Sequence, residues 1–97
     1  MEFLVIAYDG KDADAKDRRL RARPAHLDGI QVLKQAGSFI NGGAILDDEG
    51  DMIGSTLYVD FPSREALNQW LENDPYVTGG VWRNIEVKPI KLAFRAS

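Results

Sequence analysis

The chain has 97 residues, of which 44% are hydrophobic and 28% charged, and it contains no cysteine. These values predict one globular domain, and the missing cysteine excludes a disulfide scaffold, a thiolate metal site and a cysteine nucleophile. The net charge of −3 has the wrong sign for a dedicated nucleic-acid binder. The longest uncharged run, residues 35–46, is too short to span a membrane, and Met1-Glu2 leads into a strand-like segment rather than a basic signal-peptide start, so we expect a cytoplasmic protein.

A strand followed by a helix is predicted in the first third of the chain. Residues 3–8 are continuously apolar, β-branched and aromatic, as in a strand buried on both faces. Apolar residues then recur at helical spacing up to residue 36, and Gly37 is placed to end that helix. Because proline suits the first helical turn, Pro24 predicts that the well-formed helix starts at Arg23 or Pro24, with residues 16–22 forming a turn or a kinked segment.

Two further strands, joined by a tight turn, are predicted in the middle of the chain. Residues 38–46 are strand-like, and Gly42-Gly43 indicates a bulge or a close backbone approach. The acidic, glycine-containing segment 47–51 predicts a hairpin turn. Residues 52–61 then predict the third strand.

A second helix and a last strand complete the pattern. Ser63 is a suitable N-cap for a helix whose apolar stripe is followed by Asn73-Asp74-Pro75, a sequence that ends helices. Residues 81–94 predict the last strand, in which Pro89 indicates an edge position or a strand end.

The element order is therefore β-α-β-β-α-β, which predicts a single α+β domain over residues 1–97. The simplest such fold is the ferredoxin-like plait, a four-stranded antiparallel sheet with both helices on one face. Two helices cover one face only, yet the first strand is apolar on both sides and the third strand carries Met52, Thr56 and Tyr58 opposite Ile53, Leu57 and Val59. Soluble monomers rarely expose so large an apolar face. We therefore predict a homodimer formed through the helix-free face.

The single histidine, His26, lies inside the apolar stripe of the first helix, between Ile30 and Leu33 on a helical wheel. Arg19 and Arg23 project from nearly the same side. One interpretation is a hydrogen-bonded core histidine with arginines that extend to water. The other is a general acid or base, flanked by an arginine suited to binding a carboxylate.

Asp74 and Ser55 also have two interpretations each. Asp74 is a good N-cap for the short turn that begins at Pro75, but its carboxylate is equally suited to orienting an imidazole. Ser55 follows Gly54 in the third strand, where serine is usually a small polar filler. No G-x-S-x-G motif surrounds it, so nothing indicates a nucleophile.

Other candidate sites are weaker. The segment 47–51 is acidic, but Met52 stands where a calcium loop needs glycine, so a solvated hairpin is predicted. Basic residues between 16 and 23 lie close to Asp12, Asp14 and Asp17 and lack aromatic neighbours, which favours a solvated helix start over a nucleic-acid patch. No phosphate-binding glycine motif is present, and one histidine without cysteine makes a transition-metal site unexpected. We expect no cofactor.

Several short motifs occur in an order that resembles the YCII-related (YciI-like) proteins. They are Arg23-Pro24-Ala25-His26-Leu27, Ala36-Gly37, Gly43, Gly54-Ser55, and Asp74-Pro75-Tyr76 followed by Gly79. The resemblance extends from Phe3 to Pro89, and the charged segment Lys11–Arg21 is not part of it. It implies a dimeric α+β barrel and a His–Asp active site, carried here by His26 and Asp74, with Arg23 and Ser55 as neighbours.

The combined expectation is a small enzyme without a cofactor. His26 would move a proton, Asp74 would orient the imidazole, Arg23 would hold an anionic group and Ser55 would donate a hydrogen bond. This set suits proton abstraction beside a carbonyl group, followed by isomerisation or elimination. Two alternatives stay open: a dimeric module that binds or senses a small ligand without catalysis, and a structural dimerisation domain. The fold alone does not decide between them.

Overall fold

A computed structural model describes residues 1–95 of the chain. The predicted element order is confirmed, with one additional short helix before the last strand. The elements are β1 (Glu2–Asp9), α1 (Ala15–Gln35), β2 (Phe39–Leu46), β3 (Met52–Asp60), α2 (Arg64–Asn73), α3 (Pro75–Thr78) and β4 (Trp82–Ile90). No helix within these residues is long and apolar enough to cross a membrane.

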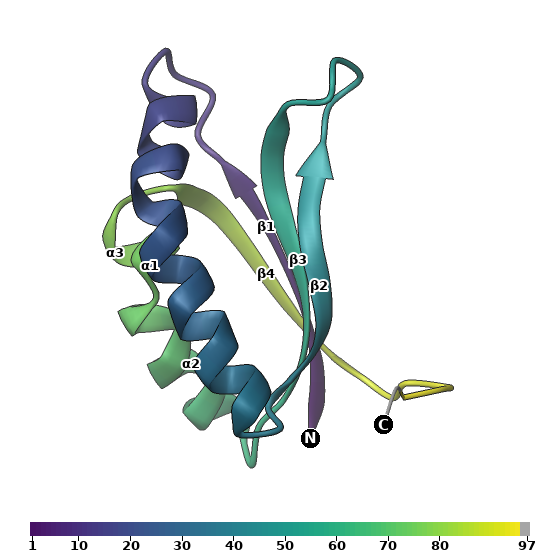
Figure 1. The fold of residues 1–97 in the computed structure, drawn as a ribbon. Helices are drawn as coiled ribbons and strands as arrows, with labels where there is room; N and C mark the ends of the chain where they lie inside the picture. Colours follow the sequence, from purple (N-terminus) through teal and green to yellow (C-terminus); the bar gives the residue numbers. More distant parts are fainter. Residues whose placement is uncertain (96–97) are drawn as a thin grey trace.

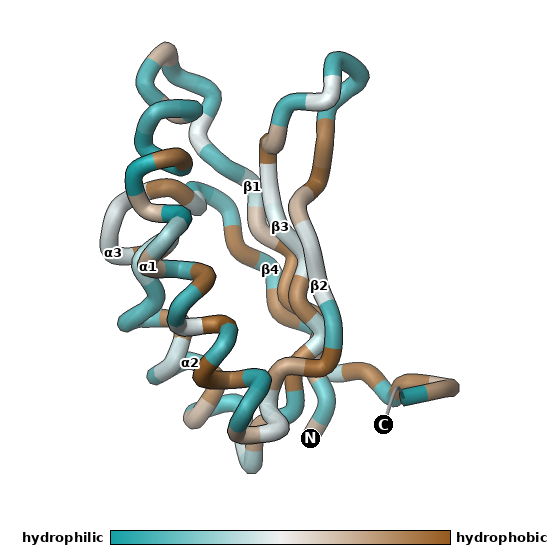
Figure 2. Tube along the Cα trace, viewed as in Figure 1, coloured by the Kyte–Doolittle hydropathy of each residue, from teal (hydrophilic) through white to brown (hydrophobic). Residues whose placement is uncertain are grey.

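The four strands form one antiparallel sheet in the order β2-β3-β1-β4, and the helices all lie on the same side of it (Figure 1). The chain therefore has the α+β ferredoxin-like fold that the element order predicts. In the register, Val5 pairs with both Leu57 and Val87, so these three side chains share one face. Figure 2 shows hydrophobic residues of α1 on its side towards the sheet, where they meet that face.

The two faces of β1 differ in burial because only one of them carries helices. Phe3, Val5 and Ala7 are buried in the core beneath the helices. Leu4 and Ile6, on the opposite face, are half-buried, and Tyr8 is 46% exposed. An apolar strand face without a covering layer is thus present, and Ile6 rather than Val5 belongs to it.

Helix α1 begins at Ala15 and continues through Pro24, so the predicted start at Arg23 or Pro24 is wrong. Proline lacks the N–H that would bond to the carbonyl of Leu20, but this removes only one bond of the ladder. Contacts outside the helix hold its first turns in place. The guanidinium of Arg18 donates to both carboxylate oxygens of Asp12, at 2.7 and 2.9 Å, and Arg19 is bound to β1.

The predicted C-terminal end of α1 and the predicted start of α2 are confirmed. Gly37 has a φ of +81°, and the N–H groups of Gly37 and Ser38 donate to the carbonyls of Lys34 and Leu33, which completes a Schellman motif. At the start of α2, the hydroxyl of Ser63 accepts a hydrogen bond of 3.1 Å from the backbone N–H of Ala66. These caps fix where α1 turns into β2 and where β3 turns into α2.

The β2–β3 pairing contains a close backbone approach at Gly42, as predicted, and an irregularity that was not. A Cβ atom added at Gly42 would lie 2.4 Å from the carbonyl oxygen of Thr56. Ile45 pairs with Gly54 but the next residue of β2 pairs with Met52, so Ile53 is an extra residue in β3. Because of this bulge, Met52 lines a cavity beneath α1 together with Leu57, whereas the sequence predicted it on the opposite side, with Thr56 and Tyr58.

Strand β4 ends at Ile90, four residues before the predicted end at Phe94, whose side chain is 94% exposed. Pro89 pairs with Phe3 at the outer edge of the sheet, one residue before β4 ends. Both positions predicted for this proline are therefore confirmed. A proline is tolerated here because one side of β4 has no neighbouring strand that would need its backbone N–H.

Candidate functional site

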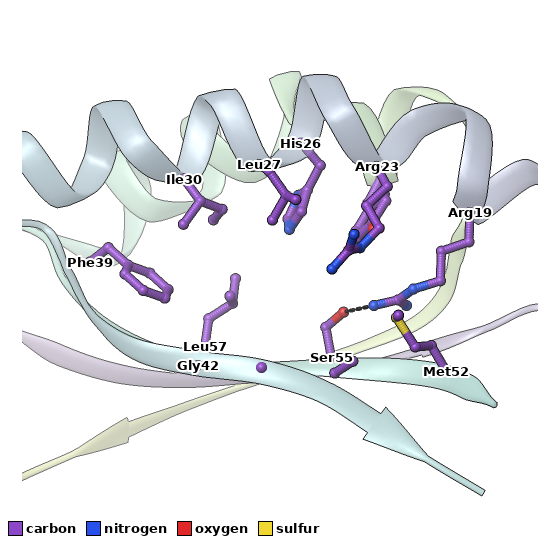
Figure 3. A pocket seen from close by; sticks show the side chains of 13 residues that line it. Arg19, Arg23, His26, Leu27, Ile30, Phe39, Gly42, Met52, Ser55 and Leu57 are labelled. Atoms are coloured by element: carbon purple, nitrogen blue, oxygen red, sulfur yellow. Dashed lines mark hydrogen bonds between the residues drawn. The ribbon is translucent and has the colours of Figure 1, made fainter. Parts of the chain in front are cut away.

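A cavity of about 130 Å³ lies between α1 and the β2–β3 side of the sheet (Figure 3). Leu27, Ile30 and Phe39 line one end of it, and this end is apolar. The other end is polar and carries Arg23 and Ser55, with His26 between the two. A small ligand with one apolar part and one charged part would match this division.

His26 and Asp74 form a buried pair. Nδ1 of His26 lies 2.8 Å from Oδ2 and 3.1 Å from Oδ1 of Asp74, and their side chains are 6% and 1% exposed. His26 is on the face of α1 towards the sheet, and Asp74 joins α2 to α3. The topology brings them together because the short helix α3 packs against α1.

Asp74 performs the two tasks that the sequence left as alternatives. Its Oδ2 accepts a 2.9 Å hydrogen bond from the backbone N–H of Tyr76, which makes it the N-cap of α3, with Pro75 in the first turn. The same carboxylate accepts from the imidazole. The N-cap geometry therefore fixes the carboxylate in the orientation that the histidine needs.

The imidazole of His26 is fixed by aromatic contacts as well. It stacks on the ring of Tyr76, with centroids 3.8 Å apart and planes 12° apart, and meets the edge of Trp82 at 5.6 Å. Burial raises the pKa of the Tyr76 hydroxyl, so this side chain stays neutral at physiological pH. The histidine is thus held between neutral rings, with its carboxylate partner on one side only.

The hydrogen bond to Asp74 decides which nitrogen of His26 is basic. A carboxylate accepts, so Nδ1 carries the hydrogen and Nε2 keeps its lone pair. Within residues 1–95, all hydrogen bonds of this ring go through Nδ1. Because His26 lines the cavity while Asp74 lies behind it, Nε2 is the nitrogen available to a ligand.

A second buried pair, Arg19 and Asp9, lies at the polar end of the cavity. Nη1 of Arg19 donates to both oxygens of Asp9, at 2.9 and 3.1 Å, and Nη2 donates to the hydroxyl of Ser55 at 3.0 Å. Burial raises the pKa of the Asp9 carboxyl, although the adjacent guanidinium opposes this effect. The interpretation that Arg19 extends to water is therefore wrong, since its side chain is 6% exposed.

The sequence missed Asp9, Trp82 and Tyr76 as parts of the site. Asp9 was interpreted only as the end of the first strand. Tyr76 belongs to the Asp74-Pro75-Tyr76 motif but was given no role in the site, and no motif marks Trp82. A signal did exist for Arg19, because Arg19, Arg23 and His26 recur at helical spacing on one face. The expected helix break at Pro24 hid the extension of that face by a full turn.

Arg23 and Ser55, the other two predicted site residues, both reach the same cavity. Arg23 is exposed at its mouth and, among residues 1–95, forms no ion pair within 4.0 Å. Ser55 is buried and accepts a further hydrogen bond of 3.2 Å from Nε1 of Trp82. The arrangement joins a free cation, a basic nitrogen and a buried hydroxyl around one small cavity.

The carboxylates of Asp47, Glu49 and Asp51 are the one group in the described chain close enough to share a cation, within 4.8 Å. Asp47 Oδ1 accepts hydrogen bonds from the backbone N–H groups of Glu49 and Asp51, and Lys16 pairs with Asp51 at 3.0 Å. These contacts are those of the predicted hairpin turn, which accounts for the acidic residues.

Known proteins resemble this chain in sequence and in structure. Protein YciI of Escherichia coli O6:H1 is 37% identical over 95% of this chain and all of its own length. The structure of the 5-chloro-2-hydroxyhydroquinone dehydrochlorinase of Burkholderia phenoliruptrix AC1100, in complex with 2,5-dihydroxybenzoquinone, is 29% identical, with a TM-score of 0.81 over 94% of both chains.

A dimeric ferredoxin-like protein of unknown function from Jannaschia sp. CCS1 shares the fold at 16% identity, with a TM-score of 0.53 over 94% of this chain and 98% of its own. The family model for the YCII-related domain matches residues 1–91. Together with the similarity to YciI over nearly the whole chain, this match identifies the protein as a member of the YCII-related family.

Proposed function

We propose that this protein is a cofactor-independent enzyme that moves a proton on a small anionic substrate through His26 and Asp74. One observation carries the proposal. Nδ1 of a buried imidazole is bound to a buried carboxylate at 2.8 Å, which leaves the opposite nitrogen at a ligand-sized cavity. A merely structural histidine does not need a cavity beside its basic nitrogen.

The first step is removal of a proton from a carbon next to a carbonyl group. Nε2 of His26 takes the proton, the electron pair moves to the carbonyl oxygen, and Asp74 stabilises the imidazolium. In a conjugated substrate, the resulting dienolate takes the proton back from Nε2 at a more distant carbon, which is an isomerisation. In a substrate with a leaving group on the neighbouring carbon, the enolate expels that group with its electron pair, which is an elimination, and Nε2 releases its proton to solvent. Arg23 binds the anionic group of the substrate and Ser55 donates to an oxygen.

The size of the cavity and the similarity to a dehydrochlorinase support a single-ring or similarly small unsaturated substrate. A cavity of roughly 150 Å³ holds benzene, and this one has about 130 Å³. The structure that is 29% identical is named as a dehydrochlorinase and holds a dihydroxybenzoquinone. An elimination from a ring of this size is the reaction that the cavity suits best.

The test of this proposal is turnover of small aromatic and unsaturated carboxylates by the wild type and two variants. His26→Ala and Asp74→Asn should each lower kcat by about 10²- to 10⁴-fold, since general acid–base catalysis contributes that much. Asp28→Asn, on the exposed side of the same helix, is the matched control and should retain full activity. Turnover that survives in both site variants contradicts the proposal, and binding without turnover by the wild type indicates a ligand-binding module.

We also infer that two copies associate through the helix-free face of the sheet. This face presents Leu4, Ile6 and Tyr8 from β1, together with Tyr58 of β3, which pairs with Leu4. Ile6→Glu should convert a species of about twice the 10.8 kDa chain mass into a monomer in sedimentation experiments. Gln31→Glu, at an exposed position of α1, should leave the dimer intact. A wild-type protein that is monomeric at micromolar concentration contradicts this inference.

A further inference from the structure

Both acceptor positions of the Ser55 hydroxyl are occupied within the protein. Its Oγ accepts from Nη2 of Arg19 at 3.0 Å and from Nε1 of Trp82 at 3.2 Å. Guanidinium and indole N–H groups can only donate, and a hydroxyl has two lone pairs and one hydrogen. The free part of Ser55 is therefore its O–H, and no residue in the described chain accepts from it.

The two donors cannot easily turn away from Ser55. Asp9 holds Nη1 of Arg19 through both of its oxygens, and the guanidinium lies 4.8 Å from the ring centroid of Tyr76. Trp82 packs edge-on against the same tyrosine at 5.4 Å. Ser55 is only 4% exposed and lines the cavity. Water therefore has little access to the hydroxyl except from the cavity side.

The donors also strengthen the remaining hydrogen bond. Each hydrogen bond accepted by a hydroxyl polarises its O–H, and a charged donor such as a guanidinium polarises it more strongly. The chain from Asp9 through Arg19 to Ser55 thus ends in a polarised donor. Such a group binds an anionic or carbonyl oxygen well, whereas a neutral hydroxyl of a ligand finds no lone pair to donate to.

We propose that Arg19, held by Asp9, and Trp82 are positioning residues that make Ser55 a donor-only contact. The cavity thereby selects ligands that present an ionised or carbonyl oxygen at Ser55, such as a phenolate or an enolate, over the corresponding hydroxyl form. The proposal rests on the proposed function to the extent that the ligand occupies the same cavity. In that reaction, Ser55 faces the oxygen that becomes negative when His26 removes the proton.

The test is the binding of 4-nitrophenol, a single-ring probe whose phenol and phenolate forms absorb differently. Titration of the bound probe against pH gives the affinity of each form. The wild type should bind the phenolate more tightly than the phenol. Ser55→Ala should lower the ratio of phenolate to phenol affinity by about 10- to 100-fold, the value of a hydrogen bond to a charged group.

Trp82→Phe tests the positioning role itself. It retains an aromatic ring but frees one lone pair of Ser55 to accept from the neutral phenol, so the affinity ratio should fall by about 3- to 10-fold. Trp70→Phe is the matched control. Trp70 lies in α2, where it packs on Phe61 away from Ser55, so this variant should leave the ratio unchanged. The double variant Asp9→Asn/Arg19→Met, which removes both charges of the pair together, should lower the ratio by a similar factor.

The other charged or titratable groups at the cavity, namely His26, Arg23 and Tyr76, are present in the wild type, Ser55→Ala and both tryptophan variants, so their contributions cancel. A ratio that does not change in Ser55→Ala and Trp82→Phe overturns the proposal, as does equal weakening of both forms or no binding to the wild type. These outcomes involve no turnover. They are therefore separate from the His26-dependent activity that tests the proposed function.

Discussion

The two buried pairs at the cavity, His26 with Asp74 and Arg19 with Asp9, are buried to nearly the same extent. They differ in which of their nitrogen atoms are already hydrogen-bonded within the protein. None of the four side chains is more than 6% exposed. The imidazole uses one nitrogen for its carboxylate and keeps the other for the cavity. The guanidinium is permanently charged and uses Nη1 and Nη2 for protein acceptors. The first pair is able to exchange a proton, and the second supports a fixed geometry.

The carboxylates of the two pairs also differ in their hydrogen-bond partners. Asp74 accepts from a backbone N–H at 2.9 Å in addition to the imidazole, so it keeps a partner if the histidine is removed. The hydrogen bonds of Asp9 all come from Nη1 of Arg19 within the described chain. Since an unpaired buried charge is costly, stability should depend more on Arg19 than on His26.

The largest effect on stability is expected when the Arg19–Asp9 pair is broken. Arg19→Met should lower the free energy of unfolding by about 3–5 kcal/mol, because it leaves the Asp9 carboxylate buried without a partner. The double variant Asp9→Asn/Arg19→Met should be clearly more stable than the single one. Urea unfolding followed by circular dichroism measures both. Equal stability of Arg19→Met and the wild type would contradict the assigned role of this pair.

A smaller loss of stability is expected at the His26–Asp74 pair, for which we propose proton transfer. His26→Gln should cost about 1–2 kcal/mol, since Asp74 retains the N–H of Tyr76 and the glutamine amide is able to donate. The same variant should lose catalysis, because an amide does not take up a proton near neutral pH. Thermal unfolding and turnover, measured on one preparation, separate the two effects. A loss of stability as large as that of Arg19→Met would erase the difference between the pairs.

The smallest effect is expected at a half-buried carboxylate, Asp60, which pairs with Arg95 at 2.7 Å and with the terminal amine at 2.9 Å. The hydrogen bond from Arg95 is the main reason that the pKa of Asp60 lies below 3.8, its ordinary value. Its contribution to stability is therefore complete above about pH 4 and is lost as the pH falls through the lowered value.

Solvent screening limits this contribution to about 0.5–1 kcal/mol. Asp60→Asn should therefore lower the free energy of unfolding by that amount at about pH 7 and have less effect at about pH 3. Urea unfolding at both pH values measures the difference, with Asp28→Asn as the control. An effect of Asp60→Asn that grows as the pH falls would contradict the expected direction.

The residue pattern predicted the fold, and the resemblance to the YCII-related proteins suggested the pairing of His26 with Asp74. Local rules placed His26 on the apolar face of a helix and Asp74 before a proline at a helix end, but they left a purely structural interpretation of each residue open. The Arg19–Asp9 pair needed two facts that local rules do not supply. One is that α1 continues through Pro24 because its first turns are held by other elements. The other is that the end of β1 lies beneath that extension.

The position of Met52 shows a similar limit. Strict alternation along β3 placed it on the side of Thr56 and Tyr58, but the extra residue Ile53 turns it into the cavity. A bulge depends on how two strands match in length and twist, which a single strand sequence does not contain. Strand β1 is apolar on both sides, so its sequence predicted an uncovered apolar face without showing which side that is, and the structure places Leu4 and Ile6 there.

Gly42 limits which positions lining the cavity can change. Its Cα is so close to β3 that a side chain would collide with the carbonyl oxygen of Thr56 at 2.4 Å. That part of the cavity is therefore bare backbone, and its depth is set by the spacing of two strands. Side chains at the opposite, apolar end, such as Leu27 and Phe39, carry no such restriction. Changes of ligand among relatives, or in directed evolution, should arise there first while the glycine stays.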